Sequence, residues 1–138
     1  MKKITLSILT IFLFCTCSVD EERIIESPSI SIINPTQELY NIGQMINIEI
    51  LISHNEVIDN ITYYETCNCT DDEFDSLELI ELKNIYEKEW SYTKSITTND
   101  IPENVMCDYN IEISADDLNG NESVKSIYFH VMTMNGEL

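Results

Sequence analysis

The chain is poor in basic residues, which limits the partners it can have. It contains 7 lysines and arginines against 25 aspartates and glutamates, giving a formal net charge of −18 at pH 7 over 138 residues. A surface of this sign repels phosphate backbones, so nucleic-acid binding is not expected. Solubility accounts for the charge without any charged partner.

Histidines and cofactor motifs are also scarce. His54 and His130 are the only two histidines, and both are predicted on strand or turn surfaces. No nucleophile elbow is present, and paired carboxylates are too common in so acidic a chain to indicate a catalytic pair. Neither G-x-G-x-x-G nor a P-loop occurs, which disfavours the α/β classes and a nucleotide cofactor. We therefore expect a protein that is not an enzyme and that has no cofactor.

No apolar run is long enough to remain in a membrane as a helix. The longest, residues 4–14, follows the basic start Met1-Lys2-Lys3 and is interrupted by hydroxyl residues. A spanning helix needs about 20 apolar residues. A charged start before a short apolar segment is typical of a secretory signal.

The end of this segment resembles a known class of exported protein. Phe14-Cys15-Thr16-Cys17-Ser18 is similar to the lipobox of bacterial lipoproteins, in the looser form found in Bacteroidetes, where a small residue precedes the lipidated cysteine. Cys17 fits, whereas Cys15 follows a bulky phenylalanine. The acidic run that follows, residues 18–22, resembles the export tract of such lipoproteins. The resemblance implies a palmitate-type lipid anchor on Cys17 and a place on the outer membrane, surface-exposed or facing the periplasm. The alternative is a plain cleaved signal on a soluble secreted protein.

The remaining length suits one domain with a real core. We assign residues 1–16 to the signal peptide, 17–28 to the acylated cysteine and an acidic tether, and 29–138 to the globular domain. Alternating apolar residues predict strands at 29–33, 45–52, 61–67, 77–86, 90–96, 109–115 and 127–132. Residues 77–86 also fit a helical stripe, and we favour the strand. Residues 53–56 are predicted to form a turn.

The last two strands are predicted to form a hairpin. Between them lie Asp117, Gly120 and Asn121, residue types that cap their own backbone or adopt positive φ. The spacing Asp117-x-Asn119-x-Asn121 also mimics the start of a calcium loop. It lacks the glycine at the sixth position and the acid at the twelfth, so turn formation is the better explanation. The acidic residues at 71–75 are interpreted as a solvated loop, with weak metal-dependent ordering as a hypothesis.

About seven short strands predict an all-β fold of the β-sandwich type, with antiparallel strands. The chain has Pro28-x-Ile30, then the 46–52 strand followed by Asn55-Glu56, then Pro102-Glu103-Asn104, then the 109–121 segment ending in Asp117-x-x-Gly120-Asn121. This order resembles the immunoglobulin-like domains of Bacteroidetes lipoproteins over residues 28–133. That resemblance implies an extracytoplasmic, non-enzymatic, lipid-anchored module that binds or assists a protein or glycan partner.

The alternative function is a carbohydrate-binding accessory lipoprotein of a polysaccharide-uptake system. It depends on the aromatic residues Tyr63, Tyr64, Tyr86, Trp90 and Tyr92. These rings would stack on sugars if some point outward, although such residues more often fill a core.

Cysteine usage leaves two further interpretations. If Cys15 is cleaved away and Cys17 is acylated, Cys67, Cys69 and Cys107 remain. In an oxidising compartment we expect Cys107 to pair with Cys67 or Cys69, closing a loop worth roughly 4 kcal/mol on the chain-entropy model. A bridge within Cys67-Asn68-Cys69 would be strained. The rival is a metal-binding envelope protein that holds a soft metal with Cys67, Cys69, Cys107 and a histidine.

Overall fold

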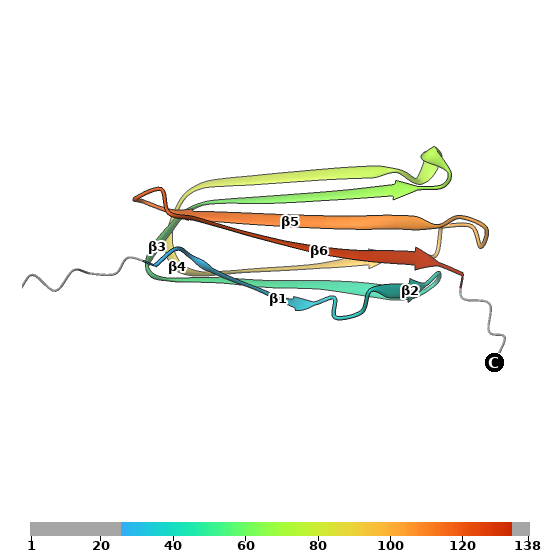
Figure 1. Ribbon diagram of the computed structural model, residues 1–138, viewed down its shortest axis with the longest axis horizontal. Coiled ribbons are helices and arrows are strands. Elements are labelled where there is room, and N and C mark those ends of the chain that lie inside the picture. Colours follow the sequence, from blue (N-terminus) through green and yellow to red (C-terminus); the bar gives the residue numbers. More distant parts are fainter. Residues whose placement is uncertain (1–25, 134–138) are drawn as a thin grey trace, which may run out of the picture.

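The structure, a computed structural model, describes residues 26–133. The signal segment, Cys17 and the tether up to residue 25 lie outside the described residues, as do residues 134–138, so the lipid anchor stays a prediction. The described elements are β1 (Ser29–Asn34), β2 (Leu39–Asn41), β3 (Met45–Cys69), the 3-10 helix η1 (Asp72–Phe74), β4 (Ser76–Thr97), β5 (Cys107–Asp117) and β6 (Glu122–Met132) (Figure 1). The all-β class is confirmed. No helix in this part of the chain is long and apolar enough to cross a membrane.

β3 is a single strand of 25 residues that bends in its middle. Its first half buries the even-numbered isoleucines from Ile46 to Ile52, whereas its second half buries odd-numbered residues from Ile61 to Cys67. The parity changes between Ile58 and Asn60, where β3 advances two residues while its partner β5 advances one. This is a β-bulge, which inserts one residue and bends the strand. The bend lets both halves of β3 present their apolar side chains to the same core.

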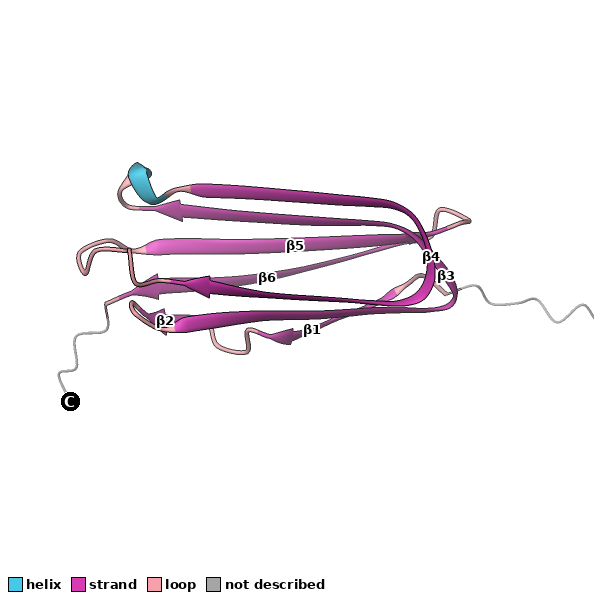
Figure 2. Cartoon of the chain, turned by 180° about the vertical axis from the view of Figure 1, so that it is seen from behind, coloured by secondary structure: helices cyan, strands magenta, loops and turns pink. Residues whose placement is uncertain are grey.

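β4 follows β3 around the same corner. Its first half pairs with the second half of β3, and its second half pairs with the first half of β3. Asn84 and Tyr86, at the corner, have φ of 57° and 55°. Non-glycine residues with positive φ are uncommon in strands and occur where the chain changes direction. The two strands therefore form one long hairpin that folds over on itself (Figure 2).

The folded hairpin produces a curled sheet with two facing layers. One layer contains β1, the first half of β3 and the second half of β4. The other contains the first half of β4, the second half of β3, β5, β6 and β2. β2 runs parallel to β6, and the other pairs are antiparallel. Apolar side chains from both layers form one core, which includes Ile46, Ile48, Ile50, Ile52, Ile61, Tyr63, Ile111, Ile113 and Phe129.

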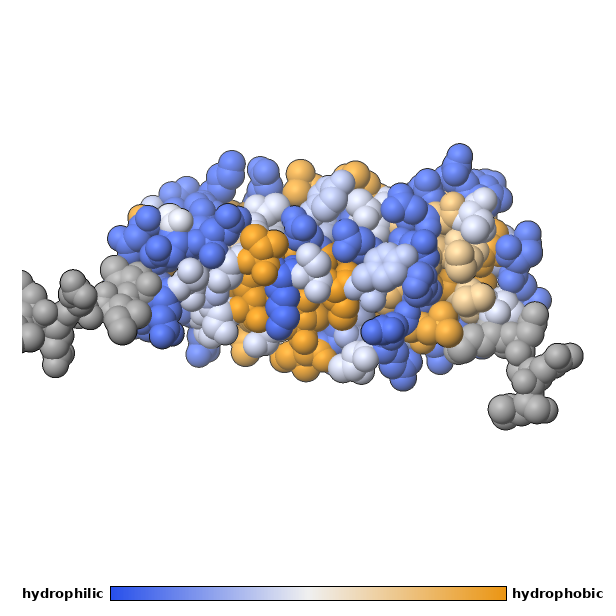
Figure 3. All heavy atoms as spheres, in the orientation of Figure 1, coloured by the Kyte–Doolittle hydropathy of each residue, from blue (hydrophilic) through white to orange (hydrophobic). Residues whose placement is uncertain are grey.

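One face of the molecule has distinct regions. Apolar side chains gather near its middle, and hydrophilic ones gather toward both ends (Figure 3). Elsewhere Leu77 and Leu79, on the first half of β4, are 65% and 53% exposed. Apolar side chains are therefore exposed in more than one place, as is usual on protein surfaces.

The structure corrects the sequence prediction in two respects. Residues 53–56 are not a turn, because β3 continues through them. Their polar composition imitates a turn, but a bulge reorients the chain without leaving the sheet. Residues 26–133 contain six strands rather than about seven: the predicted strands 45–52 and 61–67 are both parts of β3, those at 77–86 and 90–96 are both parts of β4, and β2 was not predicted. The strands are not all antiparallel, because β2 pairs with β6 in parallel. Residues 77–86 are in β4, which confirms the preference for a strand there.

Candidate functional site

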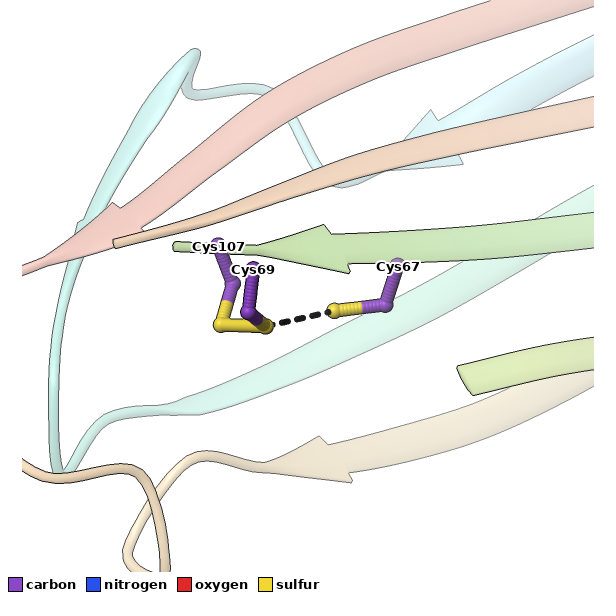
Figure 4. A group of neighbouring side chains, drawn as sticks. All are labelled: Cys67, Cys69 and Cys107. Atoms are coloured by element: carbon purple, nitrogen blue, oxygen red, sulfur yellow. Dashed lines mark hydrogen bonds between the residues drawn. A yellow bond between two sulfur atoms is a disulfide. The ribbon is translucent and has the colours of Figure 1, made fainter. Parts of the chain in front are cut away.

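Three cysteines meet at the end of the sheet opposite the β3 bend. Cys67 and Cys69 are two residues apart on β3, so their side chains share a face of the sheet. Cys107, at the start of β5, lies directly opposite Cys69 in the strand register. A disulfide joins Cys69 and Cys107, with an S–S distance of 2.03 Å, and Cys67 stays a thiol. The Cys67 sulfur lies 3.5 Å from the Cys69 sulfur (Figure 4). Of the two partners that the sequence leaves open for Cys107, the structure places Cys69 at bonding distance.

The Cys67 thiol is enclosed. Its residue is 2% exposed, and it is the hydrogen-bond donor toward Cys69 because a disulfide sulfur carries no proton. Burial raises the pKa of the Cys67 thiol, and the neighbouring carboxylates of Asp75 and Glu65 act in the same direction. Hydrogen bonds with Tyr109 and Ser76 lower that pKa but do not cancel the increase. At neutral pH this group is therefore protonated and weakly nucleophilic.

An acidic loop covers the cysteine cluster. The Cys69 backbone N–H donates to the Asp75 carboxylate at 2.6 Å, and the Thr70 N–H donates to the Met106 carbonyl at 2.8 Å. Phe74 packs against the core below. The Asp71 carboxylate caps η1 by accepting the Glu73 N–H at 3.2 Å. Two of the acidic side chains at 71–75 thus stabilise the loop backbone directly, and a metal is not needed to explain them.

The predicted turn motif is held by one carboxylate. Asp117 accepts hydrogen bonds from the backbone N–H of Asn119 and Asn121, at 2.8 and 2.9 Å, and from the Asn121 side chain at 2.8 Å. Gly120 has a φ of 79°, where a side chain would be strained. Burial opposes ionisation of Asp117, but these hydrogen bonds outweigh it and lower its pKa to about 2. The calcium-like spacing is therefore used by the turn itself.

His54 is buried at the β3 bend, which contradicts its predicted place on a turn surface. Its Nδ1 accepts the Glu56 backbone N–H at 3.3 Å, so its Nε2 carries the proton and donates to the Glu26 carbonyl at 2.6 Å. The same Nε2 lies 3.7 Å from an Asp117 oxygen. Because both ring nitrogens have backbone partners, the imidazole can be buried there, and it fixes the start of the described chain against the bend.

His130 lies on β6 in a polar surface cluster. Its Nδ1 is 2.6 Å from an Asp108 carboxylate oxygen, and the Tyr128 ring meets the imidazole edge-on at 4.7 Å. A shallow hollow beside it is also lined by Thr36, Glu38 and Ser126. His130 and Asp108 thus form a histidine–carboxylate pair that the sequence did not predict. Among the described residues, the hydrogen bonds do not connect this pair to a nucleophile.

Most of the aromatic residues proposed for sugar stacking take part in packing. Tyr63 is 1% exposed, and its ring lies 5.0 Å from that of Tyr92. Tyr92 stacks in turn on Trp90 at 5.8 Å, and both pack partly buried against the core. Tyr86 is exposed at the corner of β4. Three of the five proposed rings therefore pack against one another, and of the other two Tyr64 is half-buried.

Sequence reasoning missed a charged network inside the curl. Lys94, from the second half of β4, donates to both carboxylate oxygens of Glu65, at 3.1 and 2.9 Å, and also to Glu78. The Tyr63 hydroxyl donates to Glu65 as well. A signal was available, because Glu65 falls between Tyr63 and Cys67 at an inward position of an alternating strand.

Comparison with known proteins adds little to this geometry. No protein-family model and no curated protein matches the chain. Among solved structures, the sporulation control protein Spo0M of Bacillus subtilis shares 12% identity at a TM-score of 0.43, over 80% of this chain and 51% of that one. A β-glucosidase from Listeria innocua shares 10% identity at a TM-score of 0.46, over 78% of this chain and 17% of that one. The chain thus spans about half of the first protein and less than a fifth of the second. Likenesses this weak identify neither a family nor an activity.

Proposed function

We propose that this protein is a non-catalytic, lipid-anchored module of the bacterial cell envelope that binds or assists a partner. The observation that supports this most directly is the disulfide between Cys69 and Cys107. Such bonds persist in exported proteins and are rare in the cytosol. The charged start, short apolar segment and Cys17 of the sequence point to the same compartment.

We also propose that the curled sheet is a variant of the immunoglobulin-like fold. Divided at their bends, β3 and β4 supply four segments, and β1, β5 and β6 complete the arrangement. The layer of β1, first-half β3 and second-half β4 corresponds to strands A, B and E of that fold. The layer of first-half β4, second-half β3, β5 and β6 corresponds to strands C′, C, F and G. This segment order supports the resemblance noted in the sequence.

The proposed anchor would give the domain a direction. His54 holds the Glu26 carbonyl at the β3 bend, so the tether from Cys17 joins the domain at that end. The loop with η1 and the cysteine cluster lie at the other end (Figure 1). Nine residue steps separate Cys17 from Glu26 and reach at most about 30 Å when extended. The cysteine end would thus face away from the membrane.

The test is to compare Cys17→Ala with Cys15→Ala in cells that process lipoproteins. We expect the parent and the Cys15→Ala protein to enter the detergent phase on phase separation. The mature parent should also carry the mass of acyl chains on its first residue. Cys17→Ala should stay in the aqueous phase, because several acyl chains supply the membrane affinity. Membrane partitioning of Cys17→Ala, or a mature parent without added mass, would overturn the anchor.

A further inference from the structure

The cysteine cluster contains a thiol that the disulfide does not use. The three sulfur atoms lie within 4.8 Å of one another. In residues 26–133 no other group of three or more histidine, cysteine or acidic side chains brings its ligand atoms this close. Cys67 is not needed for the disulfide, yet its thiol is buried and points at it (Figure 4).

We propose that Cys67, Cys69 and Cys107 form a redox-gated site that binds one monovalent copper ion after the disulfide is reduced. A dithiol reductant supplies two electrons and two protons. The Cys69–Cys107 bond breaks to give two thiols, and the reductant becomes its own disulfide. The copper ion then displaces the thiol protons to the solvent as the sulfurs bind it. This inference does not depend on the lipid anchor.

The number and type of donors favour monovalent copper. Thiolates are soft ligands that select copper(I), zinc and iron–sulfur clusters. Structural zinc sites are nearly always four-coordinate, and the described residues supply a group of three. With metal–sulfur distances of about 2.3 Å, three sulfurs around one ion would be about 4 Å apart. The Cys67 and Cys69 sulfurs, 3.5 Å apart, are already near that distance. The Cys69 and Cys107 sulfurs, 2.03 Å apart in the disulfide, would have to separate after reduction, which rotation of the two side chains allows.

The surroundings of Cys67 provide hydrogen-bonding groups for a sulfur ligand. The Tyr109 and Ser76 hydroxyls are placed to hydrogen-bond a sulfur ligand, as outer-shell groups do in metal sites. Cys69 is partly exposed and offers a route for the ion to enter.

The test uses the full chain in detergent with Cys15→Ser and Cys17→Ser, so that the three cysteines are its only thiols. The protein is reduced with a dithiol, freed of reductant without oxygen, and titrated with copper(I) against a chromophoric chelator. We expect one equivalent to bind to the reduced protein and none to the oxidised protein. The affinity should increase with pH, because binding releases protons.

Variants separate a three-sulfur site from ordinary thiol binding. Cys67→Ser keeps the disulfide pair but removes the third sulfur ligand. Losing an outer-shell partner typically weakens metal binding by about 10–100-fold, and losing a direct ligand should cost more. We therefore expect Cys67→Ser to weaken copper(I) binding by at least about 100-fold. Cys107→Ser leaves the Cys67-x-Cys69 pair and should weaken binding similarly. No binding by the reduced parent, or equal affinity in either variant, would overturn the proposal.

Folding of the reduced protein provides an independent measurement. An ion that binds only the folded state raises the melting temperature. We expect copper(I) to raise that of the reduced parent and to leave that of the oxidised protein unchanged. If the reduced parent unfolds without metal, copper(I) should restore its β-sheet circular dichroism. Failure of copper(I) to do either would equally overturn the site.

Discussion

Lys94→Met tests whether the charged network holds the two layers of the curl together. Glu65 and Glu78 are directly opposed on neighbouring strands of one layer, and Lys94 reaches them from the other layer. Like charges in opposed positions repel, so the pair depends on the ammonium group between them. Glu65 is only 4% exposed, which prevents water from replacing the lost partner.

The expected loss of unfolding free energy is about 3 kcal/mol. Removing one partner of a buried ion pair costs 3–5 kcal/mol because a charge is left without compensation. The Lys94 side chain is 26% exposed, so water partly screens the ion pair and we expect a value at the lower end of that range. Adding Glu65→Gln to Lys94→Met should recover part of the loss, since one of the two facing charges is then absent.

The assay is urea unfolding followed by fluorescence of Trp90, the single tryptophan, which stacks on Tyr92. Lys83→Met is the matched control on the same strand. Lys83 lies 3.6 Å from Glu81, but their side chains are 68% and 54% exposed, so its removal should cost less than about 1 kcal/mol. Equal losses in Lys94→Met and Lys83→Met would refute the reasoning. A double variant no more stable than Lys94→Met would refute the repulsion between the carboxylates.

Four further predictions concern the disulfide, the turn and the pH dependence of two charged groups. Cys107→Ser should lower the unfolding free energy by about 4 kcal/mol, because the disulfide closes a loop of 38 residues. Cys67→Ser leaves the disulfide intact and should cost only about 1 kcal/mol, so similar urea midpoints for the two variants would contradict this prediction. Asp117→Ala should cost about 3 kcal/mol by removing the acceptor of three hydrogen bonds, and a melting temperature near that of the parent would contradict the turn geometry. Because the folded pKa of Asp117 is lowered to about 2, its contribution is present above pH 4 and is lost as the pH falls toward 2, so the difference between parent and Asp117→Ala should shrink over that interval. The folded pKa of Lys94 is raised, since hydrogen bonds to Glu78 and Glu65 outweigh its burial; the advantage of the parent over Lys94→Met should therefore be full below pH 10 and fall at higher pH.

Local patterns were sufficient to predict much of the sheet. Alternation of apolar residues located the strand at Ile46 to Ile52 and the hairpin from Tyr109 to Met132, because a half-buried strand needs that period whatever surrounds it. The turn at Asp117 was also predictable, since its residue types satisfy their own backbone. These features depend on neighbours in the sequence.

Features that depend on distant partners were not predictable. His54 lies in a polar stretch that imitates a turn, and one of the two backbone partners that allow its burial, the Glu26 carbonyl, is 28 residues away. Lys94 and Glu65 are 29 residues apart and meet because β3 and β4 bend at the same corner. The choice of Cys69 over Cys67 as the partner of Cys107 likewise depends on strand register, which shifts at a bulge that no local pattern announces.

By itself the sequence determined the all-β class, the inward faces of the strands at 46–52 and 109–115, the hairpin and the cysteines available for bonding, because each follows from side-chain alternation or residue type. Only the tertiary structure decided that two long strands fold over to form both layers, that Cys69 pairs with Cys107, and that Cys67 lies beside them. The physical reason is register: one inserted residue near Asp59 reverses which side chains of β3 face inward, and every contact beyond the bend follows from that reversal.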